Sequence, residues 1–278
     1  LSSDLDCDRL DYLRRTALHA GLPYGGVDVN YLVDNITLDD EETPCVRAKA
    51  VGPADHFLMS RSYDYAQLPF DKAVVGFEEA LKIVLTSMHK DGALDLRRAT
   101  LVEKIANREW QYFDDQRLYE RMREYKASIS ENSEKANVLL YLRCIFERRA
   151  PKLVYSSEYI SGEEKSHADE FSNKITSVRE VAQKVFSEFG LPDERWFIWD
   201  TTFRLMKGKE SGQRIRVERD SDGKRVGVDI DEDLGTLTSK FHAAVKRHIR
   251  VYACLIDEVE PKILRDKMRA RIDSELQP

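Results

Sequence analysis

The stretch SSDLDCDRLDYLRRT, residues 2–16, gathers four carboxylates and three arginines around the start of one predicted helix. Apolar residues recur there at helical spacing, which predicts an amphipathic helix from Asp8 to His19 that stops at Gly21. The polar residues beside its apolar stripe are Asp8, Asp11, Tyr12 and Arg15. One helical turn therefore carries a ligand for a hard cation, a phenol and a guanidinium.

The composition is that of a globular protein. Its 278 residues, 42% of them hydrophobic, are enough for one large domain or two ordinary ones. The 44 basic and 50 acidic residues give a net charge of −6, so no positive field covers the chain to concentrate nucleic acid or an anionic membrane. Local basic clusters could still bind anions of nucleotide size.

The cysteines favour a reducing compartment. They are far apart, follow no metal-ligand spacing and do not resemble the disulfide framework of a small secreted protein. They are Cys7, Cys45, Cys144 and Cys254. With no apolar run of 18 residues and no signal-peptide pattern in the sequence, we predict a cytoplasmic protein without a membrane partner.

The first half of the chain is predicted to be nearly all helical, with Pro69 separating two long helices and one brief strand at Cys45 to Val51. The predicted helices after the first are Asp28 to Asn35, Pro53 to Gln67, Phe70 to His89, Thr100 to Trp110, Asp114 to Lys126 and Glu131 to Arg148. Pro151 closes this series, so we predict a structural boundary near residue 150.

The second half predicts a smaller α+β lobe. The Asp222-Gly223 pair marks a hairpin between QRIRVER (213–219) and KRVGVDI (224–230). Other predicted strands are Lys152 to Tyr155, RWFIWDTTF (195–203) and Ile249 to Leu255. Helices are predicted from about Ser161 to Gly190, around Thr236 to Ala244, and from Pro261 onward.

The motif LDCDRLDYLRR, residues 5–15, resembles the closing motif of the HD-domain phosphohydrolases, in particular their deoxynucleoside triphosphate triphosphohydrolase branch. HFLMSRSYDYAQLPFDK (56–72) and FHAAVKRHIRVYACL (241–255) are similar to later segments of the same proteins. The resemblance implies a mostly α chain, in which residues 1–150 form the C-terminal portion of an all-helical HD domain and residues 151–278 a smaller α+β lobe. It also implies a metal-dependent phosphohydrolase that acts on a nucleoside triphosphate or related nucleotide.

The same resemblance assigns roles to four residues. Asp8 corresponds to the last ligand of a divalent metal ion (Mg, Mn, Fe, Ni or Zn) and is the expected catalytic residue, although Asp6 or Asp8 could simply cap the helix. Arg9 and Arg61 correspond to residues that contact substrate phosphates, and ordinary surface ion pairs are the alternative. Tyr12 corresponds to a tyrosine beside the substrate, and a core tyrosine is nearly as good an interpretation.

The chain departs from the family pattern in two ways. The family holds its metal with an earlier His and a His-Asp pair, whereas none of the histidines here precedes an Asp. Because the chain starts with Leu1 rather than Met, we expect the natural protein to begin earlier and to carry those ligands there. Thr16 and Pro69 replace an Asp and an aromatic residue that contact the sugar in the family, which puts deoxyribose selection in doubt.

Two other functions stay open from the sequence. The segment could be a non-catalytic assembly or regulatory lobe of an HD-domain protein, and a homo-oligomer is expected with either function. RIRVERDSDGKRVG (214–227) is a basic hairpin that could bind nucleic acid, but the net charge of −6 makes this partner less favoured than a nucleotide substrate.

Overall fold

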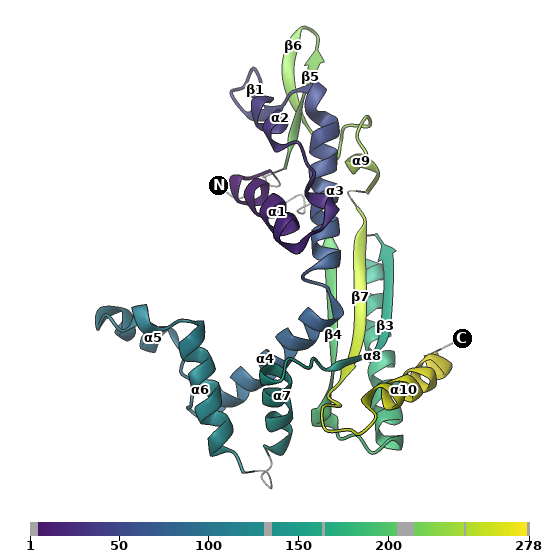
Figure 1. The fold of residues 1–278 in the computed structure, drawn as a ribbon. Helices are drawn as coiled ribbons and strands as arrows, with labels where there is room; N and C mark the ends of the chain where they lie inside the picture. The colour runs from purple at the N-terminus through teal and green to yellow at the C-terminus, as the bar shows by residue number, and fades with distance from the viewer. Residues whose placement is uncertain (1–4, 131–134, 163–164, 205–213, 242, 277–278) are drawn as a thin grey trace. The chain divides into compact units, whose positions relative to one another are not determined.

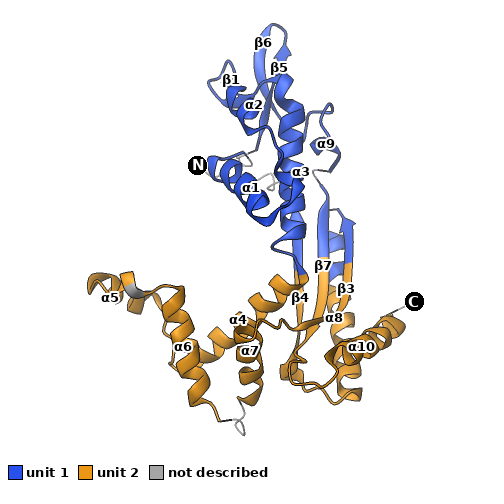
Figure 2. Ribbon diagram, in the orientation of Figure 1, with its two compact units in different colours: residues 1–71, 158–171, 201–247 blue, residues 72–157, 172–200, 248–278 orange. Residues whose placement is uncertain are grey.

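The computed structural model describes residues 5–130, 135–162, 165–204, 214–241 and 243–276 (Figure 1). It forms two compact units, each built from three separate segments (Figure 2). Unit 1 comprises Leu1–Asp71, Glu158–Phe171 and Thr201–Arg247; unit 2 comprises Lys72–Ser157, Ser172–Asp200 and His248–Pro278. Both units combine residues from before and after position 150, so the division into domains 1–150 and 151–278 stays a prediction. The start of the helix predicted from Glu131, and Gln213 of a predicted strand, lie outside the described residues.

Helix α1, Cys7–Ala20, begins and ends at the signals that the sequence carries. The side chain of Asp6 accepts a hydrogen bond from the Arg9 amide (2.8 Å) and so caps the first turn. Gly21 takes a left-handed conformation, with φ of 67°, and its amide donates back to the last turn. The predicted apolar stripe of this helix is buried, which confirms its orientation.

The remaining elements of unit 1 place a small sheet beside the N-terminal helices. They are η1 (Pro23–Gly25), α2 (Val29–Asp34), β1 (Ile36–Leu38), β2 (Pro44–Val46), η2 (Ala48–Ala50), α3 (Val51–Gln67), β5 (Arg216–Ser221), β6 (Lys224–Asp229) and α9 (Thr238–Phe241). The sheet order is β1-β2-β5-β6, and β2 runs parallel to β5 where Val46 meets Val217. The β5–β6 hairpin at Asp222-Gly223 is confirmed, with positive φ at both turn residues.

The core of unit 1 joins α1, α2, α3 and the sheet. Its fully or nearly fully buried members include Leu13, Leu32, Phe57, Leu58, Val217 and Ile230. Asp55 on α3 adds a polar anchor, because its carboxylate accepts hydrogen bonds from the amides of Leu237 (2.9 Å) and Thr238 (3.1 Å). Helix α3 is therefore held along its length by residues that lie far away in the sequence.

Unit 2 contains a helical part and most of a three-stranded sheet with the order β3-β7-β4. Its helices are α4 (Lys72–Lys90), α5 (Arg98–Ala106), η3 (Trp110–Tyr112), α6 (Asp115–Ser128), α7 (Ala136–Phe146), most of α8 (Lys165–Glu188), η4 (Asp193–Arg195) and α10 (Pro261–Leu276). The strands β3 (Lys152–Ser161), β4 (Trp196–Arg204) and β7 (Val245–Ala253) each cross the boundary between the two units.

The fold is helix-rich α+β with two small sheets, which agrees with the predicted predominance of helix. The prediction that the first half is nearly all helical overlooked β1, a strand of three residues that pairs with β2. Among the described helices, none combines the length and the apolar character needed to cross a lipid bilayer.

Candidate functional site

The candidate site in unit 1 is built around Arg61 in the middle of α3. Its side chain is almost fully buried, with 9% of the residue exposed. The guanidinium carbon lies 5.7 Å from the ring centroid of Tyr65, one turn further along α3, and 5.9 Å from that of Phe203 near the end of β4. The two rings lie 4.7 Å apart. Arg61 is thus a desolvated cation held against two aromatic faces.

Asp64 places a buried carboxylate on the same helix, one turn after Arg61. The hydroxyl of Tyr24, in η1, donates to this carboxylate at 2.6 Å. Burial, followed by this hydrogen bond, raises the pKa of Tyr24 well above its ordinary value. The buried carboxylate thus connects η1 to α3 through a single short hydrogen bond.

Tyr12 of α1 faces these α3 residues. Burial raises the pKa of its half-buried hydroxyl, and Tyr65 and Asp64 add to the effect. The positive charges of Arg61 and Arg9 act on the same hydroxyl in the opposite direction. We call Tyr12, Tyr24, Arg61, Asp64, Tyr65 and Phe203 the Arg61 cluster. The structure therefore brings Tyr12 close to Arg61, two residues to which the resemblance assigned substrate contacts, and their roles stay predictions.

Asp8 lies exposed in the first turn of α1, and the capping role belongs to Asp6. Arg9 is largely buried and its Nε lies 3.9 Å from an Asp6 carboxylate oxygen. Within the described parts of the chain, no three metal-ligating side chains come together. Asp8 can contribute a single carboxylate, so the described residues do not form a complete shell for a metal ion.

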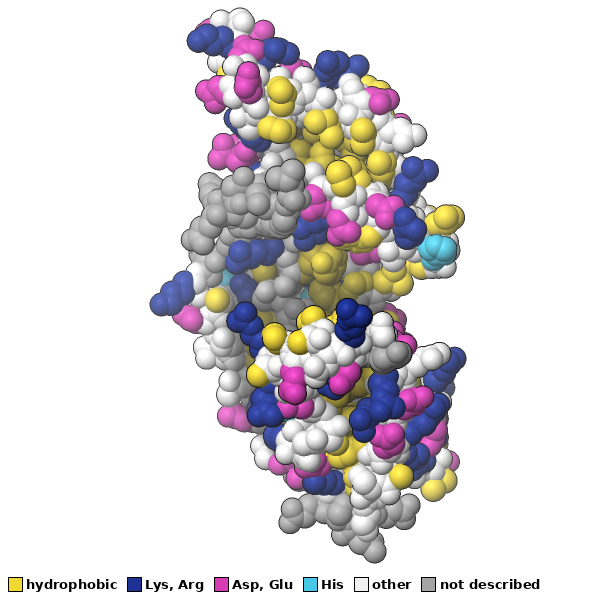
Figure 3. Space-filling model, turned by 90° about the vertical axis from the view of Figure 1, so that its left-hand side faces the viewer, with side chains coloured by type: hydrophobic (Ala, Val, Ile, Leu, Met, Phe, Trp, Pro, Cys, Tyr) yellow, Lys and Arg dark blue, Asp and Glu magenta, His cyan; other side chains and the backbone are white. Residues whose placement is uncertain are grey.

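The basic hairpin β5–β6 has its arginines paired with carboxylates. Arg216 lies 3.1 Å from Asp39, and Arg225 lies 3.1 Å from Asp40. Further ion pairs join Arg214 to Asp231 and Arg219 to Asp233. On the molecular face drawn in Figure 3, basic and acidic side chains are likewise interspersed, without a continuous basic surface.

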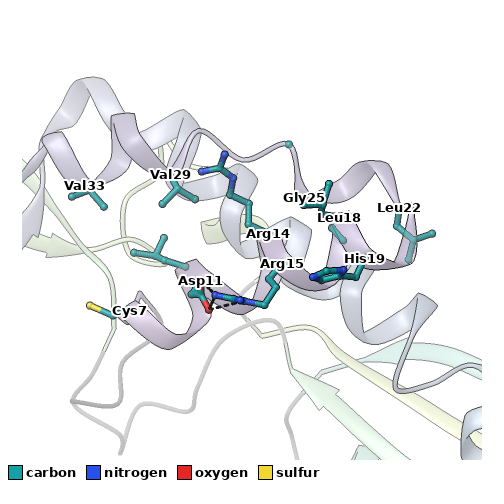
Figure 4. Close-up of a pocket in the computed structure, with 13 residues that line it drawn as sticks. Cys7, Asp11, Arg14, Arg15, Leu18, His19, Leu22, Gly25, Val29 and Val33 are labelled. Carbon is teal, nitrogen blue, oxygen red and sulfur yellow. Dashed lines mark hydrogen bonds and ion pairs between the residues drawn. The ribbon is translucent and has the colours of Figure 1, made fainter.

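A groove of about 880 Å³ follows a different side of α1 (Figure 4). Its lining includes Asp11, Arg14, Leu18, Leu22, Val29 and Val33. The exposed Asp11 and Arg15 form a two-pronged ion pair there, with a closest approach of 2.8 Å. The lining of the groove does not include Arg9, Tyr12 or Arg61, so this groove is separate from the candidate site.

Four members of the Arg61 cluster were not predicted as site residues from the sequence: Tyr24, Asp64, Tyr65 and Phe203. Asp64 had a usable signal, because it lies one helical turn from Arg61 on the buried side of α3. Tyr24 and Phe203 had none, since one belongs to a short turn and the other lies 142 positions after Arg61. Thr16 and Pro69, the two departures from the family pattern, are both half-buried.

A comparison of the sequence with protein-family models finds no match. Over 95 residues, which make up 33% of this chain, the sequence is 27% identical to the uncharacterized protein YwfO of Bacillus subtilis (strain 168). The fold is similar to that of a hypothetical protein from Aquifex aeolicus, with a TM-score of 0.64 and 19% identity over 95% of this chain. It is also similar to a phosphohydrolase from Bacteroides thetaiotaomicron VPI-5482, with a TM-score of 0.59 and 16% identity over 90% of this chain.

The chain spans less than two thirds of each of these proteins: 22% of the first, 56% of the second and 62% of the third. At these identities the two structural similarities concern the fold. The comparisons therefore establish an architecture shared by longer proteins, one of which is a phosphohydrolase.

Proposed function

We propose that this chain is part of an HD-superfamily, metal-dependent phosphohydrolase that acts on a nucleoside triphosphate or related nucleotide. The observation that carries the proposal is the Arg61 cluster, a buried guanidinium beside the Tyr12 hydroxyl in a fold similar to that of a phosphohydrolase. A homo-oligomer is proposed as well, as the resemblance implied.

Arg61 would bind the phosphates. A guanidinium that is already removed from water and stacked on two rings loses little freedom when it binds a phosphate oxygen. Its planar donors suit two parallel hydrogen bonds to a phosphate group. Arg9, at the start of α1, would contribute a second positive charge.

Tyr12 would donate a hydrogen bond to the same ligand. Because burial raises the pKa of its hydroxyl, the side chain keeps its proton at neutral pH and acts as a donor. The hydrogen bond between Tyr24 and Asp64 would hold the binding residues in place, since it ties η1 to α3. Thr16, in place of the family carboxylate, offers the sugar a neutral hydroxyl group only.

Asp8 would hold the metal as one ligand among several. A bound divalent ion supplies an activated water molecule and polarises a phosphoryl oxygen. The exposed position of Asp8 at the first turn of a rigid helix suits a hard-cation ligand. The described residues bring together no group of three metal-ligating side chains, so we propose that further ligands come from elsewhere in the complete protein. Nucleic acid is a less suitable partner, because the hairpin arginines already have carboxylate partners.

The test compares Asp8→Asn with Asp11→Asn in the complete natural protein. Both carboxylates are exposed on α1, but only Asp8 is a proposed metal ligand, and Asp11 is paired with Arg15. We expect Asp8→Asn to lower metal-dependent release of phosphate or triphosphate by at least about 100-fold and to reduce bound metal. Asp11→Asn should keep both the release of product and the bound metal. Unchanged turnover and metal content in Asp8→Asn would refute the assignment.

Arg61 is tested by Arg61→Lys, with Arg15→Lys as an exposed control. Lysine keeps the charge but loses the planar pair of donors, so we expect the KM for the nucleotide to rise about tenfold or more. Arg15→Lys should leave KM unchanged, because Arg15 lies outside the cluster and pairs with Asp11. Equal effects of the two substitutions would argue against a phosphate contact at Arg61.

The alternative function is a non-catalytic assembly or regulatory lobe of an HD-domain protein. It is favoured by the lack of a three-ligand metal set among the described residues. The two functions differ in what the complete protein does with metal and nucleotide. If the complete protein binds neither, while its oligomeric state depends on this chain, the lobe interpretation replaces the hydrolase.

A further inference from the structure

Two cysteines that the sequence separates by 110 positions meet inside unit 2. Cys144 lies on α7 and Cys254 directly follows β7, and their sulfur atoms are 3.5 Å apart. They are 1% and 0% exposed. A disulfide requires an S–S distance of about 2.05 Å, so each sulfur would have to move by less than roughly 1 Å.

The two thiols have different surroundings. The pKa of Cys254 is lowered, first by a hydrogen bond with Cys144 and then by the Ile256 amide and the charge of Arg195. The same hydrogen bond, which either sulfur could donate, and burial raise the pKa of Cys144. Arg195 is fixed beside Cys254, because its Nη2 donates to the Cys254 carbonyl oxygen at 2.7 Å. Cys254 is therefore the better nucleophile of the two.

We propose that Cys144 and Cys254 form an oxidisable dithiol, which closes to an intramolecular disulfide when the protein meets a peroxide. The Cys254 thiolate attacks one peroxide oxygen, so that an S–O bond forms, the O–O bond breaks and the leaving hydroxide takes up a proton to become water. The Cys144 sulfur then attacks the Cys254 sulfur, the S–O bond breaks, and the second hydroxide leaves as water with the Cys144 proton. Two thiols and one hydrogen peroxide give one disulfide and two water molecules.

A cavity borders the core that holds the two thiols. A cavity of about 500 Å³ in unit 2 is lined by Ser87, Val138, Tyr141, Trp196 and Phe197, among others. Tyr141 also belongs to the buried cluster that contains both cysteines. Tyr141 therefore links the cavity wall to the core that contains the thiols, and a peroxide has to pass this packed layer to reach them.

The disulfide would close a loop of 110 residues. Closing such a long loop restricts the unfolded chain more than the folded one, which stabilises the folded protein. It would tie α7 to the chain after β7, and both of these belong to unit 2. We therefore expect the oxidised protein to unfold at a temperature about 5 to 10 °C higher than the reduced one.

The test oxidises the complete protein carrying Cys7→Ser, which removes the exposed thiol. After treatment with hydrogen peroxide, free thiols are alkylated in denaturant and the peptides are mapped by mass spectrometry. Cys45 is the internal control, because it is also buried but lies in unit 1 on β2. We expect a Cys144–Cys254 disulfide, an alkylated Cys45, and reversal of the thermal shift by dithiothreitol.

Two outcomes would overturn the proposal. One is that Cys144 and Cys254 stay alkylated to the same extent as Cys45 while peroxide is consumed. The other is a disulfide that joins Cys45 to either residue, since that would require an opened fold. Cys254→Ala is a supporting variant that should abolish the cross-link. If this variant does not fold, the peptide map of the Cys7→Ser protein decides alone.

Discussion

Replacing Tyr24 by phenylalanine removes one oxygen atom from the base of the candidate site and leaves the ring in place. Tyr24 is 7% exposed and its hydroxyl donates to the Asp64 carboxylate, which is 4% exposed, at 2.6 Å. In the variant this carboxylate stays buried but loses a charge-assisted hydrogen bond. The perturbation therefore acts mainly on one interaction between η1 and α3.

The expected loss of stability follows from that single bond. Hydrogen bonds to charged groups contribute about 1.5 to 3 kcal/mol, and leaving a buried charged group without its donor places the cost toward the upper end of that range. For a protein of this size, such a loss corresponds to a melting temperature lower by roughly 3 to 10 °C. The substitution hardly changes the surface that is exposed on unfolding, so the free energy of unfolding should fall with urea concentration at the same slope in both proteins.

Urea unfolding monitored by circular dichroism measures this loss. Tyr63→Phe is the matched control, because Tyr63 lies on the same helix as Asp64 and is 51% exposed. We expect the control to change the free energy of unfolding by less than about 0.5 kcal/mol. A similarly small change in Tyr24→Phe, or equal losses in both variants, would refute the view that this hydrogen bond holds the site together.

Three further predictions concern pH and packing. Burial raises the pKa of Tyr12, Tyr24, Tyr125 and Tyr141 above 10.0, their ordinary value, so the unfolded chain releases these protons first and stability should fall as pH rises above about 10. The urea midpoint at about pH 8 and about pH 11 measures this, and equal midpoints would contradict it. On the acid side, the pKa of Asp91 is lowered, chiefly by a hydrogen bond from Lys135. Stability should therefore be lost as pH falls below about 4, and Lys135→Met should weaken that acid dependence. Gly25→Ala should destabilise unit 1 by about 1 to 3 kcal/mol, because the new Cβ would lie 2.3 Å from the Cβ of Ala17. Gly52→Ala is the control, because no atom lies within 4 Å of its added Cβ, and it should be neutral or stabilising. Thermal unfolding of the two variants measures the difference.

Local signals in the sequence predicted the elements that depend on neighbouring residues. The helix stop at Gly21, the helix start at Asp28, which the structure shows to be an N-cap, and the hairpin turn at Asp222-Gly223 each lie where short-range chemistry places them. Helix α1 was predicted from Asp8 to His19 and is found at Cys7–Ala20. These features need only capping groups and residues that tolerate positive φ, both of which are visible within a few positions.

Local signals did not predict the pairings between segments that are distant in the sequence. Strand β2 pairs in parallel with β5, where Val46 meets Val217, although nothing near Val46 indicates that partner. The resemblance selected Tyr12 and Arg61, but Phe203 joins them from β4 through tertiary packing. Neither periodicity nor spacing encodes that a ring so far away in sequence will face a particular guanidinium.

The position of Asp8 on α1 limits how a metal site could be completed. The buried stripe of α1 is formed by Leu10, Leu13 and Ala17, and Asp8 is exposed on a different side of the helix. Each residue turns the helix by about 100°, so a carboxylate on that side points away from the core of unit 1. Any further ligand would have to approach from outside this core. The proposed metal site at Asp8 therefore needs further ligands from protein that covers this outer side of α1, and metal bound at Asp8 without such a covering would contradict the proposal.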